Sequence, residues 1–141
     1  MENALVIDIV GDLSLAYVDL ANEQIDELCK EIDSCLGSVD YRMANLESPV
    51  VLKMTTKPIV KSGPNLKFDY KKRGFIERIN INGYVLANNH IGDYGEEGIE
   101  NTICFLDDIK KEYVGSSLKV QDTYKSLRKT IKGINVSFIA F

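Results

Sequence analysis

Three short strand-like runs, separated by segments with a helical pattern, constrain the fold of this chain most strongly. The runs are Leu5–Val10, Tyr41–Glu47 and Tyr84–Ala87. The first is almost continuously apolar and β-branched, which is typical of a strand covered on both faces, and it is predicted to end at Gly11-Asp12. Strands that alternate with helices favour a parallel sheet, so we expect an α/β domain with a central sheet.

Apolar residues recur at helical spacing in the segments between and after these runs. The predicted helices are Asn22–Leu36, with Gly37 as its C-cap, then Phe75–Ile81 and Glu96–Tyr113. Further along, two apolar segments flank Lys132-Gly133, and this pattern predicts a hairpin of Tyr124–Ile131 with Ile134–Phe141.

The segment Val50–Asp69 has no helical period and contains two prolines and a glycine. We predict a long loop there, and loops of this length in compact domains are often functional. The basic residues of the chain gather between Lys53 and Arg73, next to and within this segment. A small anionic ligand is therefore compatible with this region.

Size and charge restrict the classes of function. The 141 residues suffice for one domain, which we place at 1–141. The formal net charge of −4 argues against nucleic acid or an anionic membrane as the main partner. No apolar run is long enough to span a membrane, and the N-terminus lacks a signal-peptide pattern. The chain as given is expected to be cytoplasmic, or cell-surface or membrane-anchored if its natural signal is omitted.

Polar side chains of a particular kind follow each of the three predicted strands. The first strand leads to Asp12, the second carries Asn45 and Glu47, and the third leads to Asn88, Asn89 and His90, the single histidine. Ligands of open α/β sheets bind outside the carboxyl ends of the strands, so we expect these side chains to meet. Carboxylate and amide oxygens with one imidazole suit a divalent metal such as Mn, Fe, Zn or Mg.

Each of these motifs also has an interpretation without a site. Gly11-Asp12 alone is a common turn, and Asn45–Pro49 is a strand end with a polar stop. The segment Asn88–His90 fits a turn in which an asparagine adopts the left-handed conformation, with Asp93 as N-cap of the next helix. The coincidence of all three motifs at successive strand ends favours a site.

Four stretches resemble a known protein family. They are "IVGDLSL", "ANLESPV", "KPIVKSGPNLKF" and "LANNHIGDYGEEGIENTICFLDDI". In this order and spacing they resemble the CapA family of poly-γ-glutamate and capsule biosynthesis proteins, relatives of the calcineurin-like metallophosphoesterases. The resemblance implies a metallophosphatase-like αββα sandwich, here its N-terminal half with a mixed central sheet. The superfamily's later histidine motifs would follow Phe141, so it also implies a C-terminally truncated domain with an incomplete site.

The resemblance also implies roles for individual residues. Asp12, Glu47 and Asn89 match metal ligands, and His90 matches the residue that contacts the phosphoryl oxygen or the leaving group. Asp93 is then expected to orient His90. Lys61 matches a lysine-glycine-proline signature and is expected to bind an anionic substrate group, with a solvated loop lysine as the alternative. Asn45 and Asn88 are expected to contact substrate.

The implied function is biosynthesis of a capsule or poly-γ-glutamate-type polymer, with metal-dependent hydrolysis of a phosphoester or related anionic bond. The alternative is a non-catalytic binding or assembly component, because fold does not fix function. The expected ligand is an anionic small molecule or an acidic polymer. A truncated sheet would leave an exposed edge, so a homo-oligomer is a further expectation. An unrelated nucleotide-binding domain is disfavoured, since no glycine-rich phosphate loop is present.

Overall fold

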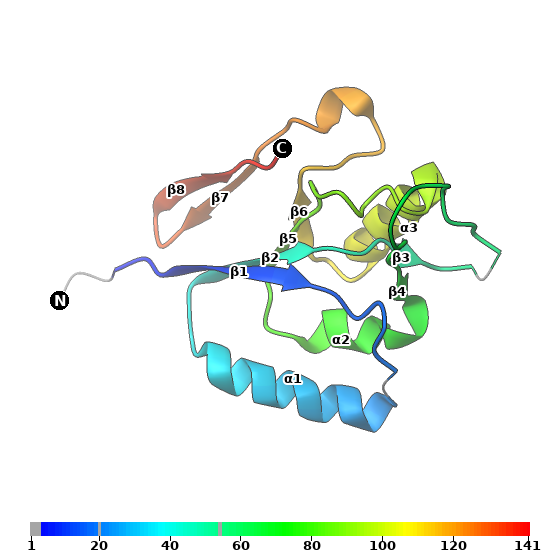
Figure 1. Ribbon diagram of the computed structural model, residues 1–141. Coiled ribbons are helices and arrows are strands. Elements are labelled where there is room, and N and C mark those ends of the chain that lie inside the picture. The colour runs from blue at the N-terminus through cyan, green and yellow to red at the C-terminus, as the bar shows by residue number, and fades with distance from the viewer. Residues whose placement is uncertain (1–3, 20, 54) are drawn as a thin grey trace.

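The computed structural model describes residues 4–19, 21–53 and 55–141 of the chain. Its centre is a four-stranded sheet with the order β1-β2-β5-β6, in which every neighbouring pair is parallel (Figure 1). The strands are β1 (Ile7–Leu13), β2 (Tyr41–Leu46), β5 (Gly83–Val85) and β6 (Glu112–Val114). All four strands therefore end at the same edge of the sheet.

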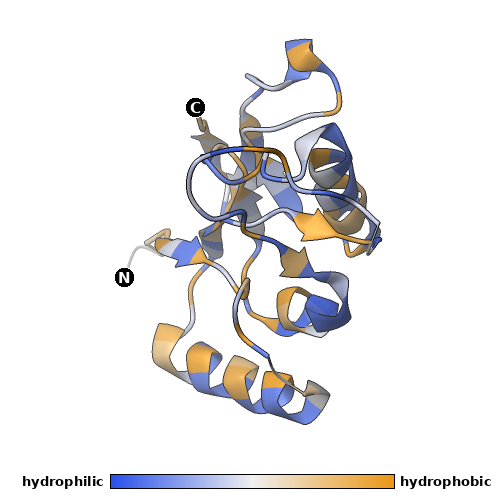
Figure 2. Ribbon diagram, turned by 45° about the vertical axis from the view of Figure 1, so that its right-hand side comes forward, coloured by the Kyte–Doolittle hydropathy of each residue, from blue (hydrophilic) through white to orange (hydrophobic). Residues whose placement is uncertain are grey.

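Three helices cover one face of this sheet. They are α1 (Asn22–Leu36), α2 (Arg73–Arg78) and α3 (Gly95–Asp108). Each new strand is added on the same side of the previous one, so right-handed crossovers place all three helices on one face. Figure 2 shows apolar residues recurring along α1, which buries Ile25 and Cys29 in the core beneath the sheet.

An antiparallel hairpin packs on the other face of the sheet. It consists of β7 (Leu127–Ile131) and β8 (Ile134–Phe138), so the predicted hairpin is present, but its first strand begins three residues later and its second ends three residues earlier than expected. Lys132 and Gly133 both have positive φ, 49° and 77°, which is the geometry of a two-residue type I′ turn. The ring of Phe138 stacks on Tyr41 of β2 with the centroids 5.1 Å apart. This contact fastens the hairpin to the sheet.

The α/β class is confirmed. The layers, helices on one face of a parallel sheet and a two-stranded sheet on the other, are consistent with part of a metallophosphatase-like sandwich. Antiparallel pairing occurs in the β7–β8 hairpin, outside the central sheet. In the part of the chain that the structure describes, no helix has the length and apolarity that a membrane crossing requires.

Several predicted boundaries are wrong. β1 does not end at Gly11 but continues through Asp12 to Leu13, with a register irregularity between Ile9 and Asp12. The third helix does not reach Tyr113, because α3 ends at Asp108 and the chain then forms β6. Lys110 takes a positive φ of 58° between these two elements, which breaks the helix.

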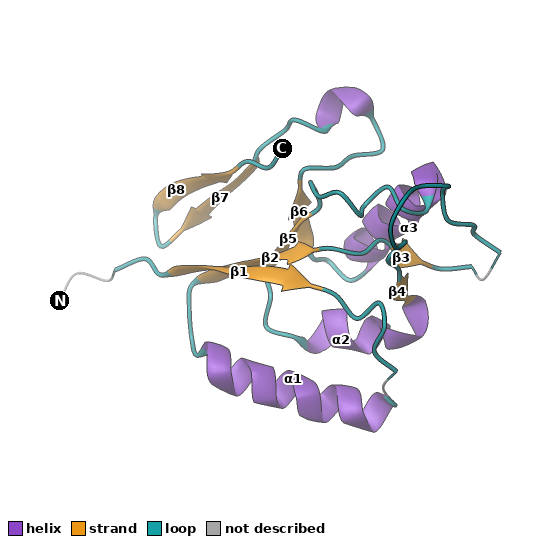
Figure 3. Cartoon of the chain, viewed as in Figure 1, coloured by secondary structure: helices purple, strands orange, loops and turns teal. Residues whose placement is uncertain are grey.

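The long segment after β2 is organised by a small parallel pair. β3 (Val50–Val51) and β4 (Phe68–Asp69) pair across a loop, drawn in teal in Figure 3, and a 3₁₀ turn, η1 (Tyr70–Lys72), leads into α2. A second 3₁₀ turn, η2 (Val120–Asp122), precedes the hairpin. The helix expected at Phe75–Ile81 begins two residues earlier and ends three residues earlier. Most of the predicted loop is therefore irregular, as expected.

One buried hydroxyl in the core provides a test of the packing. Tyr84 of β5 is fully buried, and its hydroxyl has no hydrogen-bond partner among residues 4–19, 21–53 and 55–141. We expect Tyr84→Phe to leave the free energy of unfolding unchanged or to raise it by about 1 kcal/mol, because an unpaired polar group is removed. Urea denaturation measures this change.

Tyr41→Phe is the matched control for that substitution. The Tyr41 hydroxyl donates a hydrogen bond to the Glu112 carboxylate, so its removal is expected to cost about 1 kcal/mol. A loss of stability in Tyr84→Phe as large as that in Tyr41→Phe would contradict the assignment of Tyr84 as unpaired.

Candidate functional site

A chain of side-chain hydrogen bonds crosses three strands at the carboxyl edge of the central sheet. Asn45 of β2 donates from Nδ2 to Oδ1 of Asp12 on β1, at 2.7 Å. Its Oδ1 accepts from Nδ2 of Asn88, which follows β5, at 3.0 Å. The parallel register places Asp12 beside Asn45 and so brings their side chains within hydrogen-bonding distance. Three residues from the three predicted motifs thus come together.

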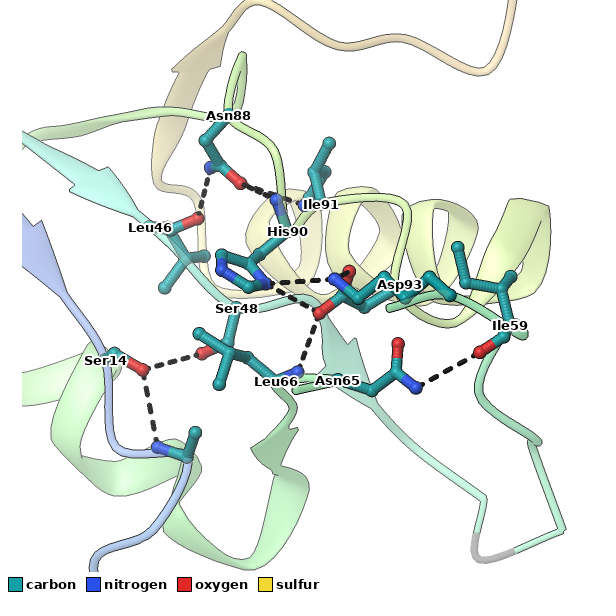
Figure 4. Close-up of polar contacts among 12 residues, drawn as sticks. Ser14, Leu46, Ser48, Ile59, Asn65, Leu66, Asn88, His90, Ile91 and Asp93 are labelled. Carbon is teal, nitrogen blue, oxygen red and sulfur yellow. Dashed lines mark hydrogen bonds and ion pairs between the residues drawn. The ribbon is translucent and has the colours of Figure 1, made fainter. Parts of the chain in front are cut away.

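Asn88 also shapes the loop that carries the histidine. Its Oδ1 accepts hydrogen bonds from the backbone N–H groups of His90 and Ile91, at 3.0 and 2.8 Å (Figure 4). Its Nδ2 donates a second bond to the carbonyl of Leu46, at 3.0 Å. Asn88 is therefore a structural cap of this turn as well as a member of the ladder, and both amide ends of its side chain are occupied.

Asp93 is the centre of a second cluster, which joins the long loop to the histidine. Its side chain is 1% exposed. One carboxylate oxygen, Oδ2, accepts from Nδ1 of His90 and from the backbone N–H of Leu66, each at 2.7 Å (Figure 4). The other, Oδ1, is paired with the ammonium group of Lys61. The backbone carbonyl of Asp93 accepts from Ile59, which fixes the loop a second time.

The environment of Asp93 keeps its carboxyl group ionised. Burial alone raises the pKa of Asp93, but the hydrogen bonds from Lys61, His90 and Leu66 outweigh it and leave the pKa below its usual value. A permanent negative charge therefore lies against Nδ1 of His90. Because a neutral imidazole must donate from Nδ1 to this carboxylate, its Nε2 is left as the acceptor.

These contacts argue against two alternatives, in which Asp93 is the N-cap of the next helix and Lys61 is a solvated loop lysine. The N-cap of α3 is Tyr94, and the Asp93 carboxylate is engaged with His90, Leu66 and Lys61. Lys61 is 22% exposed and paired with Asp93, so it is not simply solvated. Its Nζ also lies 3.4 Å from Nδ1 of His90. The catalytic and substrate-binding roles of these residues stay predictions.

The remaining predicted ligands lie at the same edge but make fewer contacts. Glu47 follows β2 and is half-buried, and Asn89 is exposed. Within the described ranges, neither side chain takes part in a hydrogen bond or an ion pair. Among those same residues, no three His, Cys, Asp or Glu side chains come close enough to hold a metal ion together. The assignment of Asp12, Glu47 and Asn89 as metal ligands therefore remains a prediction.

Two serines at this edge were missed by the sequence analysis. Ser14 and Ser48 follow the ends of β1 and β2, and their hydroxyl oxygens lie 3.4 Å apart (Figure 4). Ser48 is fully buried, whereas Ser14 is half-buried and also accepts from the backbone N–H of Ala16. Their positions just beyond Asp12 and Glu47 were the available signal, since polar residues at successive strand ends converge.

A cavity of about 510 Å³ adjoins the histidine loop on the side of β6. It is lined by residues of that loop, of α3 and of the segment after β6: Ile91, Glu96, Ile99, Glu100, Gly115–Leu118, Val120 and Thr123. Its only charged lining residues are the two glutamates, Glu96 and Glu100. This cavity is therefore unsuited to an anionic group.

Comparison with known proteins identifies the family. The sequence profile of the family described as bacterial capsule synthesis protein PGA_cap matches residues 6–141. The chain belongs to this family. The matched range includes both the hydrogen-bonded ladder and the Asp93 cluster, so the PGA_cap assignment covers the whole candidate site.

Two curated relatives support the PGA_cap assignment. The capsule biosynthesis protein CapA of Bacillus anthracis is 26% identical over 143 residues, which cover 97% of this chain and 34% of that protein. The PGA biosynthesis protein CapA of Bacillus subtilis (strain 168) is 24% identical over 144 residues, covering 99% of this chain and 38% of that protein. The chain thus spans a little over a third of the length of these relatives.

Proposed function

We propose that this PGA_cap chain acts in the biosynthesis of a capsule or poly-γ-glutamate-type polymer, and that its strand-end site hydrolyses a phosphoester or related anionic bond. The observation that supports this proposal is the pair of linked clusters at one edge of a parallel sheet. One presents the Asp12 carboxylate through Asn45, and the other fixes His90 through a buried, ionised Asp93. An oriented imidazole beside an acidic side chain is suited to phosphoryl chemistry.

Part of a divalent-metal site is compatible with the side chains at this edge. Asp12 is exposed, Glu47 is half-buried and Asn89 is exposed, and their oxygen atoms are of the type that Mg and Mn prefer. Such an ion, when bound, would supply a hydroxide from water near neutral pH. Since the described residues hold no group of three acidic, histidine or cysteine side chains, these three residues would be part of a larger ligand set.

The chain's own residues contribute orientation and charge in this proposal. Asp93 keeps the proton of neutral His90 on Nδ1, so that Nε2 carries the electron pair, or in the protonated ring an N–H. A protonated His90 would stabilise negative charge that develops on a phosphoryl oxygen. Asn45 and Asn88 hold Asp12 in place across the three strands. Lys61 keeps Asp93 ionised by pairing with its second oxygen.

The test is hydrolysis of phosphoester substrates by the longest form of the protein that its gene encodes, with Mn or Zn added. Asp12→Ala and His90→Ala are expected to lose activity to background, while Ser126→Ala, which precedes β7 and whose hydroxyl accepts from Arg128, retains it. Positioned acid–base groups of this kind typically contribute about 100-fold or more to the rate. If the wild type and both site variants are equally inactive with every metal, the enzymatic proposal fails.

A second candidate is a non-catalytic component that binds or assembles an acidic polymer. The observation that favours it is the pairing of Lys61 and His90 with Asp93, because these groups then stabilise the loop rather than face a ligand. This candidate predicts polymer binding that survives removal of divalent metals with a chelator and weakens as salt is raised. Binding that disappears with the chelator would contradict it.

A further inference from the structure

Three lysines line a cavity formed by the β3–β4 pair and the η1 turn, which shares no lining residue with the acidic cavity beside α3. Lys53 follows β3, Lys67 precedes β4 and Lys71 lies in η1, and all three line one cavity of about 290 Å³. We refer to these three side chains as the lysine surface. The β3–β4 pairing places them together, because it brings Val51 opposite Asp69.

The charges of the lysine surface are not neutralised within the described part of the chain. Its three ammonium groups make no hydrogen bond or ion pair there, and all three residues are exposed. By contrast, Lys61 and Lys72, in the same region, are engaged with Asp93 and with backbone carbonyls. This surface therefore concentrates three ammonium groups, beside the single carboxylate of Asp69, in a chain whose net charge is −4.

One acidic residue also lines this cavity, and its carboxylate has a local task. Asp69 accepts a hydrogen bond from the backbone N–H of Lys71 at 2.9 Å, and this bond begins the η1 turn. The rest of the lining is Val51, Leu52 and Tyr70. The cavity is thus lined by three cationic groups, one anionic group and apolar side chains. This lining fits a flexible ligand that carries several negative charges along an aliphatic backbone.

We propose that the lysine surface binds a carboxylate-bearing polymer; this inference rests on the proposed function for the identity of that polymer. Three ammonium groups on separate flexible stems are three separate point charges, so they match negative charges spread along a chain. Each exposed ion pair contributes little, and only a polymer engages several lysines at once.

The lysine surface also connects with the candidate site. Lys67 is the neighbour of Leu66, whose backbone N–H donates to the buried Asp93 carboxylate. The loop that carries Lys67 is thus anchored to the residue that orients His90. A polymer bound along the lysine surface would be held next to the strand-end site rather than inside it.

The test measures binding of fluorescently labelled poly-γ-glutamate of defined length to the 141-residue chain by anisotropy at low ionic strength. In the variant K53Q/K67Q/K71Q, the dissociation constant is expected to rise by about tenfold, since several weak ion pairs are lost together. The matched control K30Q/K110Q/K119Q removes the same charge from exposed lysines on other elements and is expected to change the constant less than about twofold. Circular dichroism verifies that both variants are folded.

Several outcomes would overturn the proposal. They are an absence of wild-type binding, equal losses in the two triple variants, and tighter binding of polyphosphate or duplex DNA than of polyglutamate at the same salt. His90→Ala is expected to bind the polymer as the wild type does. Polymer binding by the chain together with no hydrolysis by the longest form of the protein would refute the proposed hydrolysis alone, whereas hydrolysis without polymer binding would refute this inference alone.

Discussion

Replacement of Arg42 by alanine is expected to lower the free energy of unfolding by about 3–5 kcal/mol, which is the typical cost of removing one partner from a buried, hydrogen-bonded charge pair. Arg42 lies in β2 and is fully buried. Its guanidinium pairs with Asp8 of β1 at 2.9 Å. It also donates to the carbonyls of Leu36 and Gly37 at the end of α1, at 2.8 and 3.0 Å.

A fourth contact extends the reach of Arg42 to the segment after α2, where the carbonyl of Asn80 accepts from it at 3.2 Å. One side chain therefore satisfies carbonyls from two connections as well as a carboxylate. In Arg42→Ala these acceptors lose their donor in a place with little access to water, so each carries a desolvation cost.

Urea denaturation followed by circular dichroism measures the effect of Arg42→Ala. Arg128→Ala is the control, because Arg128 is exposed on β7 and is expected to change stability by less than about 0.5 kcal/mol. Arg42→Lys, which keeps the charge but has fewer donors, is expected to fall between the two. An Arg42→Ala variant as stable as Arg128→Ala would show that the buried contacts of Arg42 are energetically unimportant.

Asp93→Asn is expected to have the second-largest effect, a loss of about 2–3 kcal/mol. The substitution keeps the shape of the side chain but removes the charge that holds both Lys61 and His90. The loss is smaller than for Arg42→Ala because asparagine keeps the volume of the side chain, whereas alanine leaves a cavity and removes the donor from three carbonyls. Asp122→Asn, which removes an exposed pair with Lys125, is the control and is expected to be nearly neutral.

The pH dependence of stability tests the same residue independently. The pKa of Asp93 is lower in the folded chain than the value of about 3.9 expected in the unfolded chain. Its contribution to stability is therefore fully present above that unfolded value and is lost as the pH falls through the folded value. Thermal unfolding from pH 6 down to about pH 3 should show a steeper decline for the wild type than for Asp93→Asn. Parallel declines would contradict the assignment.

The sequence predicted the framework of the site better than its details. Strand periodicity and the rule that parallel strands share their carboxyl edge were sufficient to bring Asp12, Asn45 and Asn88 together. The helix Asn22–Leu36 was predicted to the residue, since Gly37, with a φ of 67°, ends it by a local signal. These features depend on neighbouring residues or on one general rule of parallel sheets, so they can be predicted from a single sequence.

Other features depend on contacts between distant residues and had no such signal. The apolar residues Ile109 and Tyr113 continue the helical period of α3. For this reason the sequence pattern predicted helix where the structure has β6. The left-handed conformation at Lys110, uncommon for a residue other than glycine or asparagine, could not be predicted locally. The partner of Lys61 lies 32 residues away across an irregular loop, and Arg42 resembled an ordinary polar strand residue.

The all-parallel order of the central sheet has a consequence for the kinetics of folding. Strand pairs such as Ile7 with Tyr41 and Met43 with Gly83 form only after a chain segment more than thirty residues long has closed. The entropic cost of this closure comes before the two strands gain any hydrogen bonds. The β7–β8 hairpin needs only a two-residue turn, and hairpins form in about 1–10 μs. The C-terminal hairpin is thus expected to form early and locally, whereas assembly of the sheet that carries the site limits the rate.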